Sequence, residues 1–339
     1  MSPERSGTRG WLQRAIRSGE RWGLIGVLVS LALFALGAVV FGAGPLIAQA
    51  GAVGPAGLAV LLLLSVINYV LRALRWQLFS VRLAIRVALL RNALYYVAGF
   101  AFAVTPAKLG EIVRLWFLRR AHGYPYEKTV GLLVVDRLSD ALALVLLMVI
   151  GLVAVSGHEI AVFAFAALVL VATFALLHPT WPMALLSWTF ARVGRQKRLF
   201  ARARSALRHL TKLGDPRVFA LALVLAAGGW FAEGLALHLL LGLLGAPISL
   251  LEACFAFAAA MVFGALALMP GGLGTTEVGL VGLLAALGVA PETAIVATAV
   301  IRMTTLWFAV FLGFGALAIA LRLIGEQGLG VSALRRSTG

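Results

Sequence analysis

The feature that most constrains this chain is a succession of apolar runs, each long enough to cross a lipid bilayer. A transmembrane helix needs about 20 predominantly apolar residues. Such runs lie at residues 23–42, 56–74, 129–155, 159–178, 217–244 and 293–323. Only 12% of the residues are charged, whereas a soluble domain carries about 25%, and the alternation typical of a membrane barrel is missing. The sequence therefore predicts an all-α polytopic membrane protein with about six full spans.

The basic residues lie in short runs between the apolar segments, although the formal net charge of the chain is +16. Because no polar domain is present to bind nucleic acid, this pattern is interpreted as a determinant of topology: Lys and Arg collect in cytoplasmic loops. It predicts a cytoplasmic tail at 1–22, a basic cytoplasmic loop at 192–217 and a second tail at 324–339. Both termini are therefore expected in the cytoplasm, flanking a single membrane domain at 23–323.

Two further apolar segments are interrupted by helix breakers, in "TPAKLGEIV" and in "MPGGLGTTEVG". Each arm beside a break is too short to span the bilayer. Proline and glycine are tolerated at membrane depth where the freed backbone groups face protein or a watery cavity. The two segments are therefore predicted to form re-entrant helical hairpins. The predicted hairpin-tip residues are Pro106, Gly110, Pro270, Gly271, Gly272 and Gly274.

The two breaks belong to an apparent internal repeat, at about 92–155 and about 250–323. Both read Pro-x-x-Leu-Gly followed closely by Glu. Further along, Glu127 lies ten residues before Arg137, and Glu292 lies ten residues before Arg302. Chance similarity between two apolar, glycine-rich segments is the alternative. With the topology above, the hairpins enter from opposite faces, which is the inverted-repeat arrangement that places a transport site near the bilayer midplane.

Charged residues within the apolar segments are the candidates for that site, because each costs about 2.5–3.5 kcal/mol at span depth. The candidates for the translocation site are Glu111, Arg114, Asp136, Arg137, Asp140, Glu277 and Arg302; secondary candidates are Asn68, Arg72, Arg75, Lys108 and Glu233. The expectation is that Glu111, Arg137, Glu277 and Arg302 converge in a hydrated cavity, so that the substitution Arg302→Ala leaves the protein inserted in the membrane.

Structural interpretations of the same residues remain open. Arg137 and Asp140 are three residues apart on one helix and are able to form a structural ion pair. Arg72 and Arg75 share a helical face with Asn68 but are interpreted first as side chains that snorkel to phosphates at the cytoplasmic surface. Glu233 and His238 are interpreted as interhelical hydrogen-bonding groups before proton carriers.

The stretches "TPAKLGEIVRLWFLRRAHGYPYEKTVGLLVVDRLSD" and "MPGGLGTTEVGLVGLLAALGV…AVIRMTTLWF" resemble the membrane region of lysylphosphatidylglycerol synthases. The resemblance extends over about 20–323. It implies a flippase-like membrane domain that moves a lipid, or a lipid-linked headgroup, across the bacterial cytoplasmic membrane. The synthases also carry a soluble aminoacyl-transferase domain; the residues after 323 are too few for one, so aminoacylation is not expected.

The expected function is therefore lipid translocation, with Arg114, Arg137 and Arg302 meeting a phosphate. The acidic candidates would hold those arginines, meet a cationic headgroup or carry protons. The alternatives are a non-transporting scaffold for a glycosyltransferase or lipid-modifying enzyme, and a secondary transporter of a small anion. No catalytic motif is visible, and Cys254 is the only cysteine, so neither enzymatic activity nor a metal or other cofactor is expected.

Overall fold

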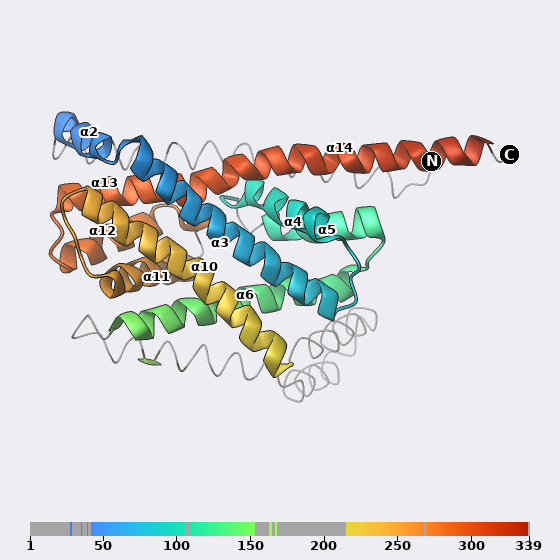
Figure 1. Cartoon of the computed structure of the whole chain (residues 1–339), viewed down its shortest axis with the longest axis horizontal. Coiled ribbons are helices and arrows are strands. Elements are labelled where there is room, and N and C mark those ends of the chain that lie inside the picture. Colours follow the sequence, from blue (N-terminus) through green and yellow to red (C-terminus); the bar gives the residue numbers. More distant parts are fainter. Residues whose placement is uncertain are drawn as a thin grey trace, which may run out of the picture.

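The computed structural model describes residues 42–105, 109–152, 215–267 and 269–337, with isolated positions at 28, 35, 39, 163, 164 and 167. The described part of the chain is built of helices (Figure 1). Three of its helical stretches are long and apolar enough to cross a membrane: Gly54–Arg82, Pro216–Leu243 and Pro291–Ile324. These observations confirm an all-α membrane protein.

Several predicted features lie outside the described residues. Pro106 and Lys108 are among them, and so are the predicted span at 23–42, apart from its isolated positions, and most of the span at 159–178. The basic loop at 192–217 is described only from residue 215 onward.

Three long helices form one side of the molecule: α3 (Gly54–Arg82), α6 (Tyr126–Gly151) and α10 (Pro216–Leu243). Helix α10 packs along α3 and also contacts α6 (Figure 1). At about 1.5 Å per residue each helix is roughly 40 Å long. A short helix, α2 (Ala43–Ala52), precedes α3.

Basic residues gather at the end of the molecule where α3 stops and where α6 and α10 begin. Arg82 at the end of α3 pairs with Asp215, the N-cap of α10, at 2.7 Å. Lys128 Nζ, in the first turn of α6, donates to the Ala84 carbonyl at 3.1 Å. The loops that the sequence assigns to the cytoplasm are thus neighbours in space, and we refer to this end as the basic end.

The first break joins two short helical arms. Helix α4 (Leu89–Ala98) starts at the basic end, since Asn92 bonds to Ser80 of α3, and it continues as the 3-10 turn η1 (Gly99–Phe102). After the break, α5 (Leu109–His122) returns the chain toward that end (Figure 1). The two arms approach each other closely at Gly110. A Cβ there would overlap the carbonyl oxygen of Gly99, so only glycine fits this position without a shift of the backbone.

The second break joins α11 (Leu250–Leu266) to α12 (Thr275–Ala286) through the 3-10 turn η4 (Pro270–Gly272). Gly271, Gly272 and Gly274 have φ of 62°, 68° and 81°, a region that residues with a Cβ rarely adopt. This hairpin starts at the opposite end of the molecule, where Leu251 of α11 packs against Gly151, the last residue of α6.

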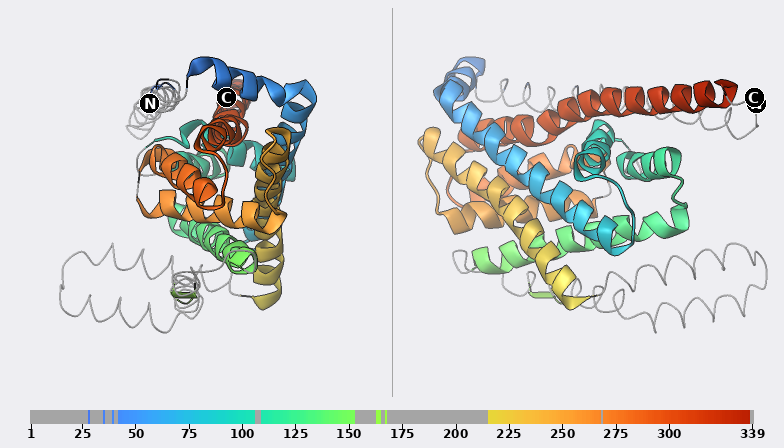
Figure 2. Two further views of the ribbon diagram at one scale, coloured as in Figure 1. Left: turned by 90° about the vertical axis from the view of Figure 1, so that its left-hand side faces the viewer. Right: turned by 45° about the vertical axis from the view of Figure 1, so that its right-hand side comes forward.

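The two hairpins meet at their tips. A Cβ at Gly271 would lie 3.1 Å from the Cα of Val104, so the two turns touch. Val104 and Leu273 are buried in one cluster with Trp307 and Val310 of the last helical segment. The two short hairpins thus start at opposite ends of the molecule (Figure 2), and residues of their turns contact each other.

The last helical segment passes this contact and is not uniform. It comprises α13 (Pro291–Arg302), a π-helical turn η5 (Met303–Trp307) and α14 (Phe308–Ser337), which continues into the predicted tail. Single π-helical turns occur preferentially at functional sites. Here the turn follows Arg302 directly, and the Tyr69 hydroxyl of α3 donates to the Thr305 carbonyl within it.

The close approach in the first hairpin predicts a strong effect of Gly110→Val. The new side chain would overlap the backbone of Gly99, and overpacking costs about 1–3 kcal/mol, occasionally more. We expect a lower unfolding temperature in detergent. Gly282→Val is the matched control, because nothing lies within 4 Å of its Cβ position. Equal unfolding temperatures for the two variants would show that the arms do not pack in this way.

Candidate functional site

Arg75 of α3 is the centre of a buried ion network that joins α3 to Asp136 and Asp140 of α6. Its side chain is fully buried. Nε and Nη2 donate to Asp136 Oδ1 at 3.1 and 2.6 Å, and Nη1 donates to Asp140 Oδ1 at 2.8 Å. Asp136 and Asp140 are one helical turn apart on α6, so a single guanidinium reaches both carboxylates.

Two further arginines bind the other oxygens of these carboxylates. Arg72 donates to Asp140 Oδ2 at 3.0 Å. Arg137 lies 2.7 Å from Asp136 Oδ2 and 3.1 Å from Asp140 Oδ2, which forms the pair predicted from their spacing. Arg137 Nε also lies 3.3 Å from Glu111 on α5, so this residue ties the first hairpin to α6.

Arg114 contributes the fourth guanidinium and sits among aromatic rings. Its Cζ lies 3.8 Å from the ring centroid of Tyr96, and Phe100 and Trp76 flank it at 5.4 and 5.8 Å. Nε donates to the Tyr96 carbonyl at 3.0 Å. Its other contact is weak, since Nη1 is 3.9 Å from Asp136 Oδ2. Cation–π contacts and one carbonyl therefore hold Arg114 in place.

The second hairpin has its own, smaller ion pair. Arg302 Nε donates to Glu277 Oε1 at 2.7 Å, and Arg302 Nη2 donates to the Gly271 carbonyl at 3.0 Å. Both side chains are at most a tenth exposed. After each break, an acidic residue pairs with an arginine of the following helix: Glu111 with Arg137, and Glu277 with Arg302.

No ion pair among the described residues joins these two pairs directly. Among the described residues Arg302 forms its ion pair with Glu277, and none joins it to the network around Arg75. Glu233 of α10 is a separate buried acidic residue that bonds to α3. Asn68 Nδ2 and Ser65 Oγ, from α3, donate to its carboxyl at 2.6 and 3.4 Å. The interhelical hydrogen bonding expected of Glu233 is thus present.

Two interpretations from the sequence need correction. Arg72 and Arg75 do not snorkel to the surface: α3 continues to Arg82, so Arg75 lies two turns inside the helix end, where it pairs with Asp136 and Asp140. His238 does not bridge two helices, because its Nδ1 bonds to the Ile248 carbonyl in the loop that follows its own helix.

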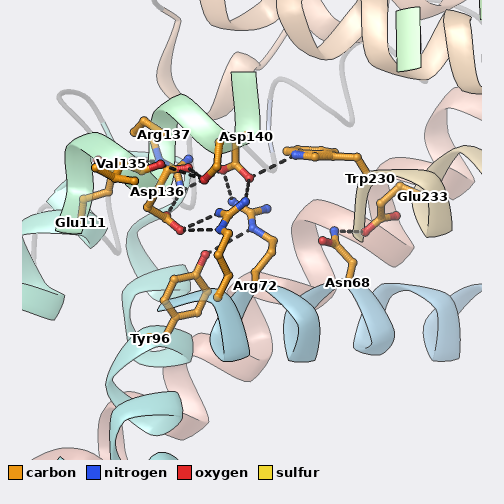
Figure 3. A network of polar contacts seen from close by, with 12 residues as sticks. Asn68, Arg72, Tyr96, Glu111, Val135, Asp136, Arg137, Asp140, Trp230 and Glu233 are labelled. Carbon is orange, nitrogen blue, oxygen red and sulfur yellow. Dashed lines mark hydrogen bonds and ion pairs between the residues drawn. The ribbon is translucent and has the colours of Figure 1, made fainter. Parts of the chain in front are cut away.

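Two site residues were missed in the sequence. Tyr96 stacks on Arg114, and its hydroxyl accepts from Arg72 Nε at 3.3 Å. Trp230 of α10 donates from its indole to Asp140 Oδ1 at 3.2 Å (Figure 3). Both lie in apolar runs where an aromatic residue is ordinarily part of the packing, so the sequence offers nothing to distinguish them.

The network around Arg75 carries an excess positive charge. Among the described residues its members are Arg72, Arg75, Arg114, Arg137, Glu111, Asp136 and Asp140, four cations against three carboxylates. Two of its donors, Arg114 Nη1 and Arg137 Nε, make no hydrogen bond, although a carboxylate oxygen lies within ion-pair distance of each. The residues described contain no group of His, Cys, Asp or Glu that could hold a metal ion. The arrangement therefore suits a monovalent anion with several oxygen atoms.

The long apolar helices and the buried ion network define a polytopic helical membrane protein with a charged interior. The chain matches the model of the lysylphosphatidylglycerol synthase transmembrane region over residues 23–313, and it therefore belongs to that family. No curated protein sequence matches it. Membership confirms the resemblance noted in the sequence and fits a lipid-related role in a membrane.

Proposed function

We propose that this protein moves a phosphate-bearing lipid, or a lipid-linked headgroup, across the bacterial cytoplasmic membrane. The two hairpins act as re-entrant elements of an inverted repeat, and the network around Arg75 binds the phosphate during passage. Membership of the family supports a substrate that is a membrane lipid. The observation that carries the proposal is the excess positive charge of the buried network, in which two guanidinium N–H groups make no hydrogen bond.

The arrangement of the hairpins supports the inverted repeat. They start at opposite ends of the molecule, their tips touch at Val104 and Gly271, and each is tied by an arginine to the helix that follows it. The turns that enter these helices also match, since Gly123 and Gly288 have φ of 74° and 85°. Irregular backbone in the middle of a membrane protein commonly marks a substrate site.

A phosphate fits the network, whereas the excess positive charge would repel an amine. A phosphodiester carries one negative charge, which matches the single excess cation, and guanidinium groups bind phosphate oxygens through paired N–H donors. Arg137 and Glu111 are the open edge of the network, with side chains 32% and 18% exposed, whereas Arg75 is completely buried. The lipid phosphate therefore approaches Arg137 first.

Arg137→Gln is expected to slow phospholipid movement in reconstituted vesicles by about tenfold to a hundredfold, because a hydrogen bond to a charged group contributes about 1.5–3 kcal/mol. The variant should still accumulate in the membrane, since Arg72 and Arg75 continue to hold both aspartates. Movement is measured by the loss of a headgroup label to a reagent that cannot cross the bilayer.

Arg119→Gln is the matched control. Arg119 is also basic and lies on α5, but it is exposed and packs over the Tyr126 ring at 4.9 Å. Wild-type rates for both variants would exclude Arg137 from the mechanism.

We further propose that the chain acts without enzymatic chemistry, and that its ligand is the lipid itself. A scaffold for a lipid-modifying enzyme remains the competing function, since a paired ion network also holds helices together. The two functions differ in one respect: a scaffold moves no lipid in vesicles that contain only this protein.

A further inference from the structure

Glu233 is a buried carboxyl group with neutral partners. It lies in the middle of α10 and is 1% exposed. Its hydrogen-bond donors are the amide of Asn68 and the hydroxyl of Ser65. Among the described residues no cation lies within ion-pair distance of it. An ionised carboxylate in such a position is costly, whereas a protonated carboxyl is not.

The amide of Asn68 can serve Glu233 in either protonation state. Nδ2 donates to Glu233 Oε1 at 2.6 Å, which suits a carboxylate. Asn68 Oδ1 is buried and has no hydrogen-bond partner. A half-turn of the amide exchanges the two atoms, and Oδ1 then accepts from the O–H of a protonated carboxyl. Gly229 leaves room for this oxygen, since a Cβ there would lie 2.7 Å from it.

The surroundings of Glu233 connect it to both ion clusters. The charged and titratable groups that act on it electrostatically are Tyr69 and Arg72 of α3 and Arg302 of α13. From α6, Asp140 reaches α10 through Trp230, one helical turn from Glu233; from α11, the thiol of Cys254 packs against Gly234. Arg72 belongs to the network around Arg75, and Arg302 belongs to the second pair.

We propose that Glu233 is a proton-binding site that couples lipid movement to the proton gradient across the membrane. The coupling rests on the proposed function, whereas proton binding does not. A phosphate bound at the network cancels its excess positive charge. The positive potential that the network exerts at Glu233 through Arg72 then falls, and the protonated form of Glu233 is favoured. When the phosphate leaves, the potential returns and the proton is released. One proton is taken up and one is released in each cycle.

Infrared difference spectra recorded between high and low pH test proton binding directly. In the wild type we expect the carbonyl band of a protonated carboxylic acid to appear as the pH falls. Glu233→Gln should lose that band. Glu252→Gln should keep it, because Glu252 is a half-buried residue of the capping box at the start of α11, where it bonds to Ser249. Identical spectra for the wild type and Glu233→Gln would overturn the proposal.

Asn68→Ala provides a second variant if Glu233→Gln does not accumulate. Glu233 keeps its proton there but loses its closest hydrogen-bond partner, so its carbonyl band should shift in frequency. An unshifted band would overturn the assignment.

Vesicles with an imposed pH gradient test the coupling. The wild-type rate of phospholipid movement should change by up to about tenfold for each unit of pH difference, and Glu233→Gln should lose this response. A wild-type rate that ignores the gradient would overturn the coupling. If the wild type moves no phospholipid, the proposed function fails, and the infrared titration still decides whether Glu233 binds a proton.

Discussion

Arg75→Met is expected to lower the abundance of the protein in membranes strongly, because the variant is too unstable to accumulate. Arg75 is fully buried and provides three hydrogen bonds to Asp136 and Asp140. Its loss leaves Asp136 Oδ1 without a donor in the interior, and breaking a buried ion pair by removing one partner costs about 3–5 kcal/mol. That is a large fraction of the stability of a typical folded domain, about 5–15 kcal/mol. Abundance in membranes and the unfolding temperature in detergent measure the effect.

Arg82→Met is the control for this prediction. It is the same substitution on the same helix, but the pair of Arg82 with Asp215 is exposed, with side chains 47% and 31% accessible. Exposed ion pairs contribute about 0–1 kcal/mol. If Arg75→Met accumulates as well as Arg82→Met, the network is not the structural centre that its geometry indicates.

The second large effect concerns Arg302 and Glu277, and here the structure revises the expectation from sequence. The sequence predicts a hydrated cavity around Arg302, and in such a cavity Arg302→Ala would leave the protein inserted in the membrane. The two side chains are instead at most a tenth exposed. The single substitution therefore leaves the buried carboxylate of Glu277 without its ion-pair partner. We now expect Arg302→Ala to lower abundance strongly, by the same reasoning as for Arg75.

A neutral double variant separates structure from function at this pair. Replacing a buried ion pair by apolar or neutral groups of similar volume is often tolerated, so Arg302→Met with Glu277→Gln should restore abundance. Lipid movement should stay lost if the pair serves translocation. Wild-type lipid movement in the double variant would show that the pair has only a structural role, holding the second hairpin to α13.

The second helix break is the feature of the fold that the sequence predicts most directly. Pro270 and the glycines after it predict a break, and the positive φ angles at Gly271, Gly272 and Gly274 are its physical basis. The boundary of α3 was less readable. The predicted span at 56–74 stopped before Arg75 because basic residues follow closely, whereas the helix continues to Arg82. That error put two buried arginines at the surface.

The partners within the site depended on tertiary packing. The spacing of Arg137 and Asp140 predicts their contact, because residues three apart share a helical face. Nothing in the spacing predicts that Arg75 pairs with residues 61 and 65 positions away on α6. The aromatic surroundings of Arg114 likewise arise from α3 and the first hairpin together.

The most direct test of the central claim uses the purified wild-type protein in vesicles. Two headgroup-labelled lipids with the same acyl chains are compared: a phospholipid, and a neutral glycolipid without phosphate. We predict that the protein moves the phospholipid well above the rate in protein-free vesicles and leaves the glycolipid at that background. Background rates for both lipids would contradict translocation, and equal acceleration of both would contradict recognition of the phosphate by the arginine network.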